Sequence, residues 1–296
     1  MKRILTIQDI SCIGKCSLTV ALPILSAMGS EACVIPTAVL STHTSFKGFT
    51  FRDLTQDIQP ISDHWVKEKI TFDAIYTGYL GSTEQVDLVS NIFDTYKMKD
   101  TLIFVDPAMA DNGKLYAGFT EDFAKNMARL CTKADVIVPN LTEACYMLGI
   151  PYVGEDYTRA EIEEILKDLS KLGAKKVVLT GISFHKNQLG VMAYDAVTEE
   201  FFSYYNQKVE HNYHGTGDLF ASVCVGAMMR GYTLEDALKL AVDFTLECIL
   251  KTEEDPNHRW YGVNFEEAIP MLLHRLEENE QKSDGIVELQ RSRKFR

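Results

Sequence analysis

The sequence of 296 residues has few basic residues for its size and no long apolar run. Its 30 lysines and arginines stand against 42 aspartates and glutamates, which gives a formal net charge of −12 at pH 7. A surface of that sign repels phosphate backbones and anionic lipids, so we expect neither nucleic acid nor a membrane as a partner. No stretch reaches the length of about 18 apolar residues that a membrane-spanning helix needs. The first residues, MKRILTIQDI, lack the apolar segment of a signal peptide, so we expect a cytoplasmic protein.

Several common motifs are also missing. The seven cysteines are an odd number and include no Cys-x-x-Cys pair, which argues for reduced thiols and against a disulfide framework or a zinc site. Neither G-x-x-x-x-G-K-[ST] nor a strand-linked G-x-G-x-x-G occurs, so the two common nucleotide-binding loops are absent. No linker rich in proline, glycine or serine divides the chain. We therefore expect one domain over residues 1–280, followed by a charged, loose tail over 281–296.

Short apolar runs alternate with longer stretches of helical spacing along most of the chain. The runs include RILTI at 3–7, LIFV at 102–105 and KVVL at 176–179, and three long helical stretches follow Gly217. This alternation predicts an α/β fold of three layers, α/β/α, around a central and mostly parallel sheet. The polar segment 41–60 lacks a clear period, and we expect it to form a flap over one edge of that sheet.

Polar residues follow the predicted strands. They come from separate parts of the chain, and the main ones are Asp9, Tyr79, Asp106, Asn140 and Thr180. In parallel α/β sheets, ligands bind beyond the carboxyl ends of the strands. The sequence therefore predicts that these residues converge on one edge of the sheet.

The segment Gly215-Thr216-Gly217-Asp218 stands at the start of a predicted helix. A helix start has about four N–H groups without partners and a partial positive charge. Glycines allow the backbone to approach an anion closely, so a phosphate group would fit here, with Asp218 near enough to accept a proton from an attacking hydroxyl. A glycine turn with an acidic residue in the first helical turn explains the same letters without any ligand.

Asn140 and Glu143 stand three residues apart at another predicted helix start. Their side chains would lie on one helix face, and their oxygen atoms suit Mg²⁺, directly or through water. The spacing is also that of a capping box, and the two interpretations are compatible. Asp106 and Asp111 are a further carboxylate pair for metal or phosphate contacts, although turn chemistry also explains Asp111.

The order of these motifs resembles that of the ribokinase-like superfamily of small-molecule kinases. The motifs are Asp-Pro at 106–107, Pro-Asn-x-x-Glu at 139–143, Thr-Gly at 180–181 and Gly-Thr-Gly-Asp at 215–218. Within it the chain is similar to the pyridoxal (vitamin B6) kinases. The similar segments are TIQD at 6–9, STHT at 41–44, TGY at 77–79 and GTGDLFA at 215–221. The resemblance runs from about residue 2 to about residue 275.

The resemblance implies ATP-dependent phosphorylation of the 5′-hydroxymethyl group of pyridoxal, pyridoxamine or pyridoxine. It implies a homodimer that uses Mg²⁺ and often K⁺. Asp218 would be the general base, and the N–H groups of 215–217 would hold the transferred phosphoryl group. The implied substrate-binding residues are Asp9, His43, Thr44 and Tyr79. The implied ATP-binding residues are Asp106, Asn140, Glu143 and Thr180, with Asp106 and Glu143 also near Mg²⁺.

The chain departs from the family pattern at two of these places. Asp9 stands where many pyridoxal kinases have serine, which would affect the preference among B6 vitamers, and Val138 stands where threonine is frequent. A hydroxymethylpyrimidine kinase is the nearest alternative, although its Gly-Gly-Ala-Gly start is replaced here by the segment 13–16, IGKC. A sugar kinase and a non-catalytic binding protein of the same fold are further alternatives. The presence of Asp218 together with both glycines of its motif argues against the non-catalytic protein.

Overall fold

The computed structural model describes the backbone of residues 1–154 and 156–294, and side chains up to residue 279 with the same gap. The strands are β1 (Arg3–Ser11), β2 (Glu31–Leu40), β3 (Phe51–Asp53), β4 (Ala74–Thr77), β5 (Leu102–Val105), β6 (Ala110–Asp111), β7 (Lys114–Leu115), β8 (Val136–Ile137), β9 (Lys176–Ile182), β10 (Gln188–Asp195) and β11 (Glu200–Gln207). The helices are α1 (Leu18–Ala27), α2 (Thr55–Lys67), α3 (Thr83–Tyr96), α4 (Glu121–Cys131), α5 (Leu141–Leu148), α6 (Arg159–Lys171), α7 (Thr216–Met229), α8 (Leu234–Glu254) and α9 (Phe265–Lys294).

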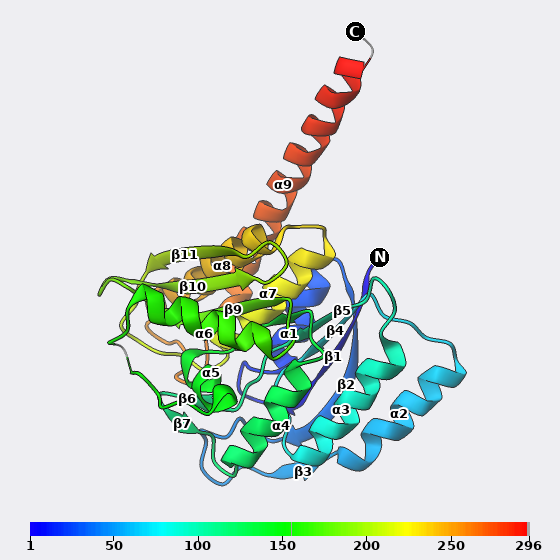
Figure 1. The fold of residues 1–296 in the computed structure, drawn as a ribbon, viewed down its shortest axis with the longest axis vertical. Coiled ribbons are helices and arrows are strands. Elements are labelled where there is room, and N and C mark those ends of the chain that lie inside the picture. The colour runs from blue at the N-terminus through cyan, green and yellow to red at the C-terminus, as the bar shows by residue number, and fades with distance from the viewer. Residues whose placement is uncertain (155, 295–296) are drawn as a thin grey trace.

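One large sheet runs through the molecule (Figure 1). Its strand order is β11-β10-β9-β8-β5-β4-β1-β2-β3. The six strands from β9 to β2 in that order run parallel, whereas β3 pairs antiparallel with β2, and β10 and β11 extend the other edge antiparallel. A separate hairpin is formed by β6 and β7. The predicted three-layer fold with a mostly parallel sheet is confirmed.

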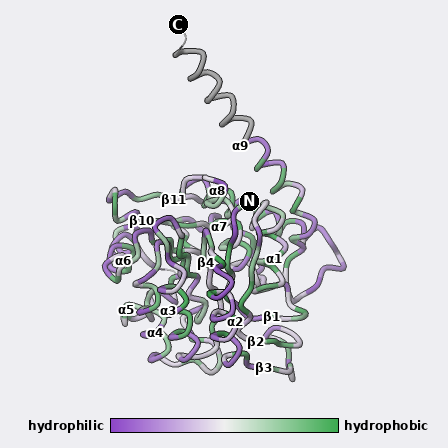
Figure 2. The backbone as a smooth tube through the Cα atoms, turned by 90° about the vertical axis from the view of Figure 1, so that its right-hand side faces the viewer, coloured by the Kyte–Doolittle hydropathy of each residue, from purple (hydrophilic) through white to green (hydrophobic). Residues whose placement is uncertain are grey.

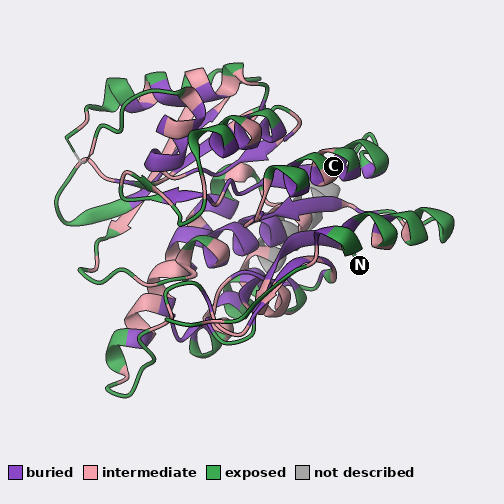
Figure 3. Ribbon diagram, turned by 90° about the horizontal axis from the view of Figure 1, so that it is seen from below, coloured by how far each residue is buried: buried purple, intermediate pink, exposed green. Residues whose placement is uncertain are grey.

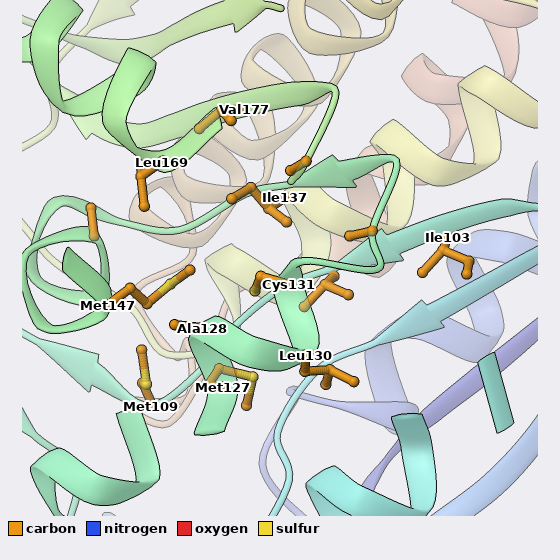
Figure 4. Packing of buried hydrophobic residues seen from close by; sticks show 14 of the residues in the cluster. Ile103, Met109, Met127, Ala128, Leu130, Cys131, Ile137, Met147, Leu169 and Val177 are labelled. Carbon is orange, nitrogen blue, oxygen red and sulfur yellow. The ribbon is translucent and has the colours of Figure 1, made fainter. Parts of the chain in front are cut away.

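The two faces of the sheet carry separate hydrophobic clusters. Helices α2 to α6 cover one face, where residues such as Met127 and Leu130 of α4 pack near Ile103 and Ile137 of the sheet (Figure 4). Helices α1, α7, α8 and α9 cover the other face. Hydrophobic and hydrophilic residues alternate along the helices (Figure 2), and the buried ones lie on the side nearest the sheet (Figure 3). Alternate strand residues therefore supply both cores.

The predicted flap is shorter than the sequence indicates. Residues 41–50 have no regular structure, but β3 and α2 occupy most of 51–60. Helix α2 buries Ile58 and packs Ile61 and Trp65 against the first cluster. These apolar residues follow the three- and four-residue spacing of a helix face, but much of that pattern lies beyond residue 60. Helix α4 is a second element that the sequence analysis does not assign.

Two further predictions concern the chain as a whole. Within the part of the chain that the structure describes, none of the helices combines the length and apolarity needed to cross a bilayer. The prediction of a loose tail concerns residues 281–296, whose side chains lie outside the described residues, as do residues 295–296 entirely. The tail therefore stays a prediction.

Replacing Phe244 of α8 with alanine should destabilise the protein strongly. Its side chain is fully buried in the second cluster, and an aromatic-to-alanine cavity in a core costs about 3–5 kcal/mol. Urea unfolding followed by circular dichroism measures the change in the free energy of unfolding. Leu273→Ala on α9 is the control, because Leu273 is 40% exposed and should change stability by less than about 1 kcal/mol. Equal effects of the two substitutions would contradict the described packing of α8.

Candidate active site

The predicted polar residues meet at the carboxyl ends of the parallel strands. Backbone hydrogen bonds continue the strand pairing just past the strand ends, from Asp106 N to Thr77 O at 3.0 Å and from Val138 N to Val105 O at 3.1 Å. Asn140, which follows β8, forms a parallel bridge with Thr180 near the carboxyl end of β9. This pairing carries the residues after β4, β5 and β8, and the end of β9, to one edge, as the sequence predicts.

Helix α7 begins at this edge without a side-chain cap. Its N-cap residue is Gly215, with φ 80°, and glycine has no side chain that could cap the helix. The Thr216 hydroxyl donates instead to the carbonyl of Tyr213 at 3.1 Å. Among the described residues, no acceptor is found for the N–H groups of Thr216, Gly217 or Asp218, so these donors remain available to an anion.

Gly215 is required by a close approach of two chain segments. A Cβ atom at Gly215 would lie 2.0 Å from the carbonyl oxygen of Lys15. Its left-handed φ is also disfavoured for other residues. The loop between β1 and α1 therefore packs directly against the start of α7, and this contact links residues about 200 positions apart in the sequence.

Asp218 lies in the first turn of α7 and is half-buried. Its Oδ2 accepts a hydrogen bond from the backbone N–H of Ser17 at 2.9 Å. Burial raises the pKa of Asp218 to about 7, the Ser17 N–H opposes the shift, and the charge of Asp9 adds to it. A carboxyl group with such a pKa takes up and releases a proton near neutral pH, as a general base does.

Asp9 is held by two serine hydroxyls. Ser17 Oγ donates to its Oδ1 at 2.6 Å and Ser11 Oγ donates to its Oδ2 at 3.0 Å. The pairing of β1 with β2 shifts register between Gln8 and Ile10, and this irregularity lies directly at Asp9. Burial raises the pKa of Asp9, while the two hydroxyls favour its charged form. Sequence analysis identified Asp9 but missed both serines.

The capping-box interpretation of Asn140 and Glu143 is confirmed. Asn140 Oδ1 accepts the N–H of Glu143 at 2.9 Å, and Glu143 Oε2 accepts the N–H of Asn140 at 2.8 Å. The Asn140 amide also donates to the carbonyl of Ala110 at 2.8 Å, and Glu143 Oε1 accepts the N–H of Met109 at 3.0 Å. Burial raises the pKa of Glu143, and its backbone donors oppose that shift. Both side chains are thus fixed before any ligand binds.

Asp106 differs from Glu143 because its carboxylate has no hydrogen-bond partner among the described residues. It is buried, and burial raises its pKa, with further contributions from the charges of Glu143 and Asp218. A buried carboxylate without a partner is costly unless a cation or donor binds it. Asp106 therefore fits a Mg²⁺ ion. In the described part of the chain no group of three or more His, Cys, Asp or Glu forms a metal site, so phosphate and water oxygens would complete the ligands.

Asp111 takes the turn role that the sequence also allows. Its carboxylate accepts the backbone N–H and the side-chain amide of Asn112, at 2.8 and 2.9 Å. Asn112 joins β6 to β7 with φ 50°. The hairpin thus uses Asp111 for its own geometry. Thr180 donates weakly to the carbonyl of Pro139 at 3.5 Å and stays partly exposed at the end of β9.

The flap residue His43 is buried among aromatic rings. Its Nδ1 accepts the N–H of Ser45 at 3.1 Å, so the proton must be on Nε2, which donates to the carbonyl of Tyr261 at 3.1 Å. Burial lowers the pKa of His43. The His43 ring contacts those of Phe46, His214 and Trp260, with centroids 4.7–6.0 Å apart. The rings of Phe46, Trp260 and Tyr261 also pack on one another, with centroids 4.5–6.0 Å apart. Three loops that are distant in the sequence are joined here, and no local motif predicts that contact.

Thr44 and Tyr79 are the remaining residues predicted to bind the substrate. Thr44 is exposed on the flap. The Tyr79 ring is half-buried and stacks on Phe119 with centroids 5.4 Å apart. Burial, with the charge of Asp9, raises the pKa of Tyr79 to about 12, so its hydroxyl is protonated at neutral pH. Phe119, which precedes α4, was not identified from the sequence.

Comparisons with known proteins agree with this geometry. A model of the phosphomethylpyrimidine kinase family matches residues 22–263. A Bacteroides thetaiotaomicron protein assigned to the phosphomethylpyrimidine kinases, crystallised with pyridoxal, is 41% identical with a TM-score of 0.88, covering 92% of this chain and 95% of that chain. Pyridoxal kinase of Lactobacillus plantarum is 30% identical with a TM-score of 0.86, covering 94% and 99%. Pyridoxal kinase of Dictyostelium discoideum is 26% identical, covering 99% and 95%.

These matches confirm the resemblance to pyridoxal kinases and to the ribokinase-like fold that the sequence motifs indicate. The family model spans most of the chain, including the site edge from Tyr79 to Asp218. The chain belongs to the phosphomethylpyrimidine kinase family.

Proposed function

We propose that this protein is an ATP-dependent kinase that phosphorylates the 5′-hydroxymethyl group of a B6 vitamer: pyridoxal, pyridoxamine or pyridoxine. The observation that carries the proposal is Asp218, with a pKa raised to about 7, beside the free N–H groups at the start of α7. A base next to an anion site is what phosphoryl transfer to an alcohol requires. The pyridoxal bound by the Bacteroides relative supports the choice of acceptor.

Asp218 would act on the acceptor hydroxyl. As that oxygen bonds to the γ-phosphorus, its proton passes to the Asp218 carboxylate and the bond between phosphorus and the bridging oxygen of ADP breaks. The N–H groups of Thr216 and Gly217 would donate to the phosphoryl oxygens, where negative charge has to be stabilised during transfer. The positive end of the α7 dipole adds to this effect.

Asp106 would hold Mg²⁺, with Glu143 contributing through water because its oxygens already accept N–H groups. When bound, the ion would neutralise phosphate charge and orient the phosphates. The remaining ATP contacts are proposed for Asn140 and Thr180. The capping box would keep Asn140 and Glu143 in place while the nucleotide enters and leaves.

The pyridine ring would lie between the flap and the end of β1. Asp9 offers a carboxylate for a ring nitrogen, phenol or amine, and Tyr79 offers an aromatic face. His43 and Thr44 would close the site from the flap and exclude water, which protects ATP from hydrolysis. The homodimer, the use of K⁺ and the cytoplasmic location stay predictions.

A hydroxymethylpyrimidine or phosphomethylpyrimidine kinase is the second candidate, because the matching family model carries that description. The same base and anion site would serve either acceptor, so the two candidates differ only at the ring. Turnover of pyridoxal, pyridoxamine, pyridoxine and hydroxymethylpyrimidine with Mg²⁺-ATP decides between them. Preference for the pyrimidine would overturn the B6 assignment and leave the proposed phosphoryl transfer intact.

Asp218→Asn should lower kcat for the preferred vitamer by about 10²–10⁴-fold, since the amide cannot take the proton. The change keeps the size of the side chain, and its Oδ atom can still accept the Ser17 N–H, so stability should change little. Steady-state ADP release measures the effect, and thermal unfolding is the control. Near-normal kcat in the folded variant would exclude Asp218 as the base.

The pH dependence of kcat/KM should show an acid limb near pH 7. Burial raises the pKa of Asp218 to about 7 in the free protein, and only its unprotonated form accepts a proton. Activity should therefore rise through pH 7 and fall about tenfold for each unit below it. The limb should coincide for pyridoxal and pyridoxine, because it belongs to the protein. An acid limb near pH 4 would contradict the raised pKa of Asp218, because that is where an ordinary carboxyl group titrates.

Gly217→Ala separates an anion site from a simple helix start. A Cβ atom at Gly217 meets nothing within 4 Å, and alanine favours a helix over glycine by up to about 1 kcal/mol. Stability should hold or rise, while kcat/KM for ATP should fall about tenfold or more as the methyl group hinders phosphate approach. Gly215→Ala is the contrast, since its Cβ would clash with Lys15 and destabilise the fold. A Gly217→Ala variant that is more stable and has normal kinetics would show that the segment is a helix start without an anion site.

A further inference from the structure

Ser17 has a strained backbone conformation directly behind the proposed base. It has φ 49° and ψ −133°, a region that residues with a side chain rarely occupy. Lys15, two residues earlier, also has a positive φ of 51°. Ser17 is buried, so no exposed turn explains the conformation.

Ser17 also gives up the usual role of a serine at its position. It is the N-cap of α1, where serine normally accepts an N–H of the first helical turn through its hydroxyl, yet it makes no side-chain capping bond. Its hydroxyl donates to Asp9 at 2.6 Å and its N–H donates to Asp218 at 2.9 Å. Both hydrogen-bond donors of Ser17 are thus directed to two carboxylates of the site, and only its carbonyl bonds to its own helix, where it accepts the N–H groups of Val20 and Ala21.

The surrounding contacts hold Ser17 in this conformation. The Lys15 carbonyl lies against Gly215. The Lys15 ammonium group donates to the carbonyl of Val263 at 3.0 Å and pairs with Glu266 at 2.8 Å. The segment is thus fixed to the starts of α7 and α9, which allows a strained residue to persist.

We propose that Ser17 is a positioning residue for phosphoryl transfer: its N–H sets the orientation of Asp218, and its hydroxyl bond to Asp9 keeps that N–H in place. The inference rests on the proposed function of Asp218 as the base. Ser17 thereby links Asp9, which is proposed to bind the acceptor ring, to Asp218, which is proposed to take the proton of the acceptor hydroxyl. An error in the position of such a group of about 1 Å costs about a hundredfold in rate.

Two substitutions at Ser17 separate positioning from stability. Ser17→Ala removes the tie to Asp9 and leaves a residue that is strained at φ 49°, so the backbone should relax and move the N–H away from Asp218. Ser17→Gly removes the same hydroxyl, but glycine tolerates the conformation and can keep the N–H in place. We expect kcat to fall about tenfold to a hundredfold in Ser17→Ala and about threefold or less in Ser17→Gly.

Ser11→Ala is the matched control, because it removes the other hydroxyl from the same carboxylate without any bond to Asp218. It should raise the KM of the vitamer more than it lowers kcat, whereas Ser17→Ala should act mainly on kcat. Initial rates at saturating Mg²⁺-ATP with the full chain measure both constants, and thermal unfolding records stability.

Three results would overturn the role of Ser17: a normal kcat for Ser17→Ala, equal losses of kcat in the alanine and glycine variants, or equal losses of kcat in Ser17→Ala and Ser11→Ala. Each would reduce Ser17 to a structural residue while the proposed function stands. Wild-type protein that turns over no B6 vitamer would overturn the proposed function as well, and this is measured before the variants.

Discussion

The site depends on one electrostatic constraint: carboxylates are gathered at the place where the proposed function requires a triphosphate to bind. Asp9 and Asp106 are buried and Asp218 is half-buried, and this loss of water raises the pKa of all three carboxyl groups. The charge of Glu143 adds to the shift at Asp106, and that of Asp9 adds to the shift at Asp218. None of these groups has a lysine or arginine partner among the described residues. Compensation comes instead from the Ser17 N–H at Asp218, from the Ser11 and Ser17 hydroxyls at Asp9 and, in the proposed function, from a divalent cation at Asp106. In that proposal the N–H groups at the start of α7 would bind the anion, so that an acidic protein needs no basic patch for it.

The same constraint explains why the loop between β1 and α1 is so tightly fixed. One segment supplies donors to both Asp9 and Asp218, and Ser17 has a positive φ where it donates to the two carboxylates. The close contact of Lys15 with Gly215 keeps that segment in place. Backbone strain, a lost helix cap and a glycine that no other residue can replace all serve one arrangement of donors. Their free-energy cost is offset by the two large cores that flank the sheet.

Much of this could be predicted from local pattern. The alternation of apolar runs and helical stretches predicted the three-layer fold. The polar residues that follow the strands predicted the edge of the sheet at which they meet. The spacing of Asn140 and Glu143 gave the capping box. Helix α2 was missed because its apolar residues are separated by polar ones and partly fall in a segment read as a flap. Phe119, Ser11 and Ser17 were missed because no local period or motif distinguishes them from ordinary core or turn residues.

The sequence by itself determined the class of fold and the position of the helix start at 215–218, where the anion site and the base are proposed. These features depend on local sequence, because the conformational freedom of glycine, the charge of aspartate and the spacing of apolar residues act over a few neighbouring positions. Only the tertiary structure decided which donors face which carboxylates and that His43 lies among aromatic rings from three loops. It also decided that Asp111 serves a turn, while Asp106 has no hydrogen-bond partner in the part of the chain that the structure describes. Those relations join residues up to about 200 positions apart, and packing, not local preference, brings them within hydrogen-bond distance.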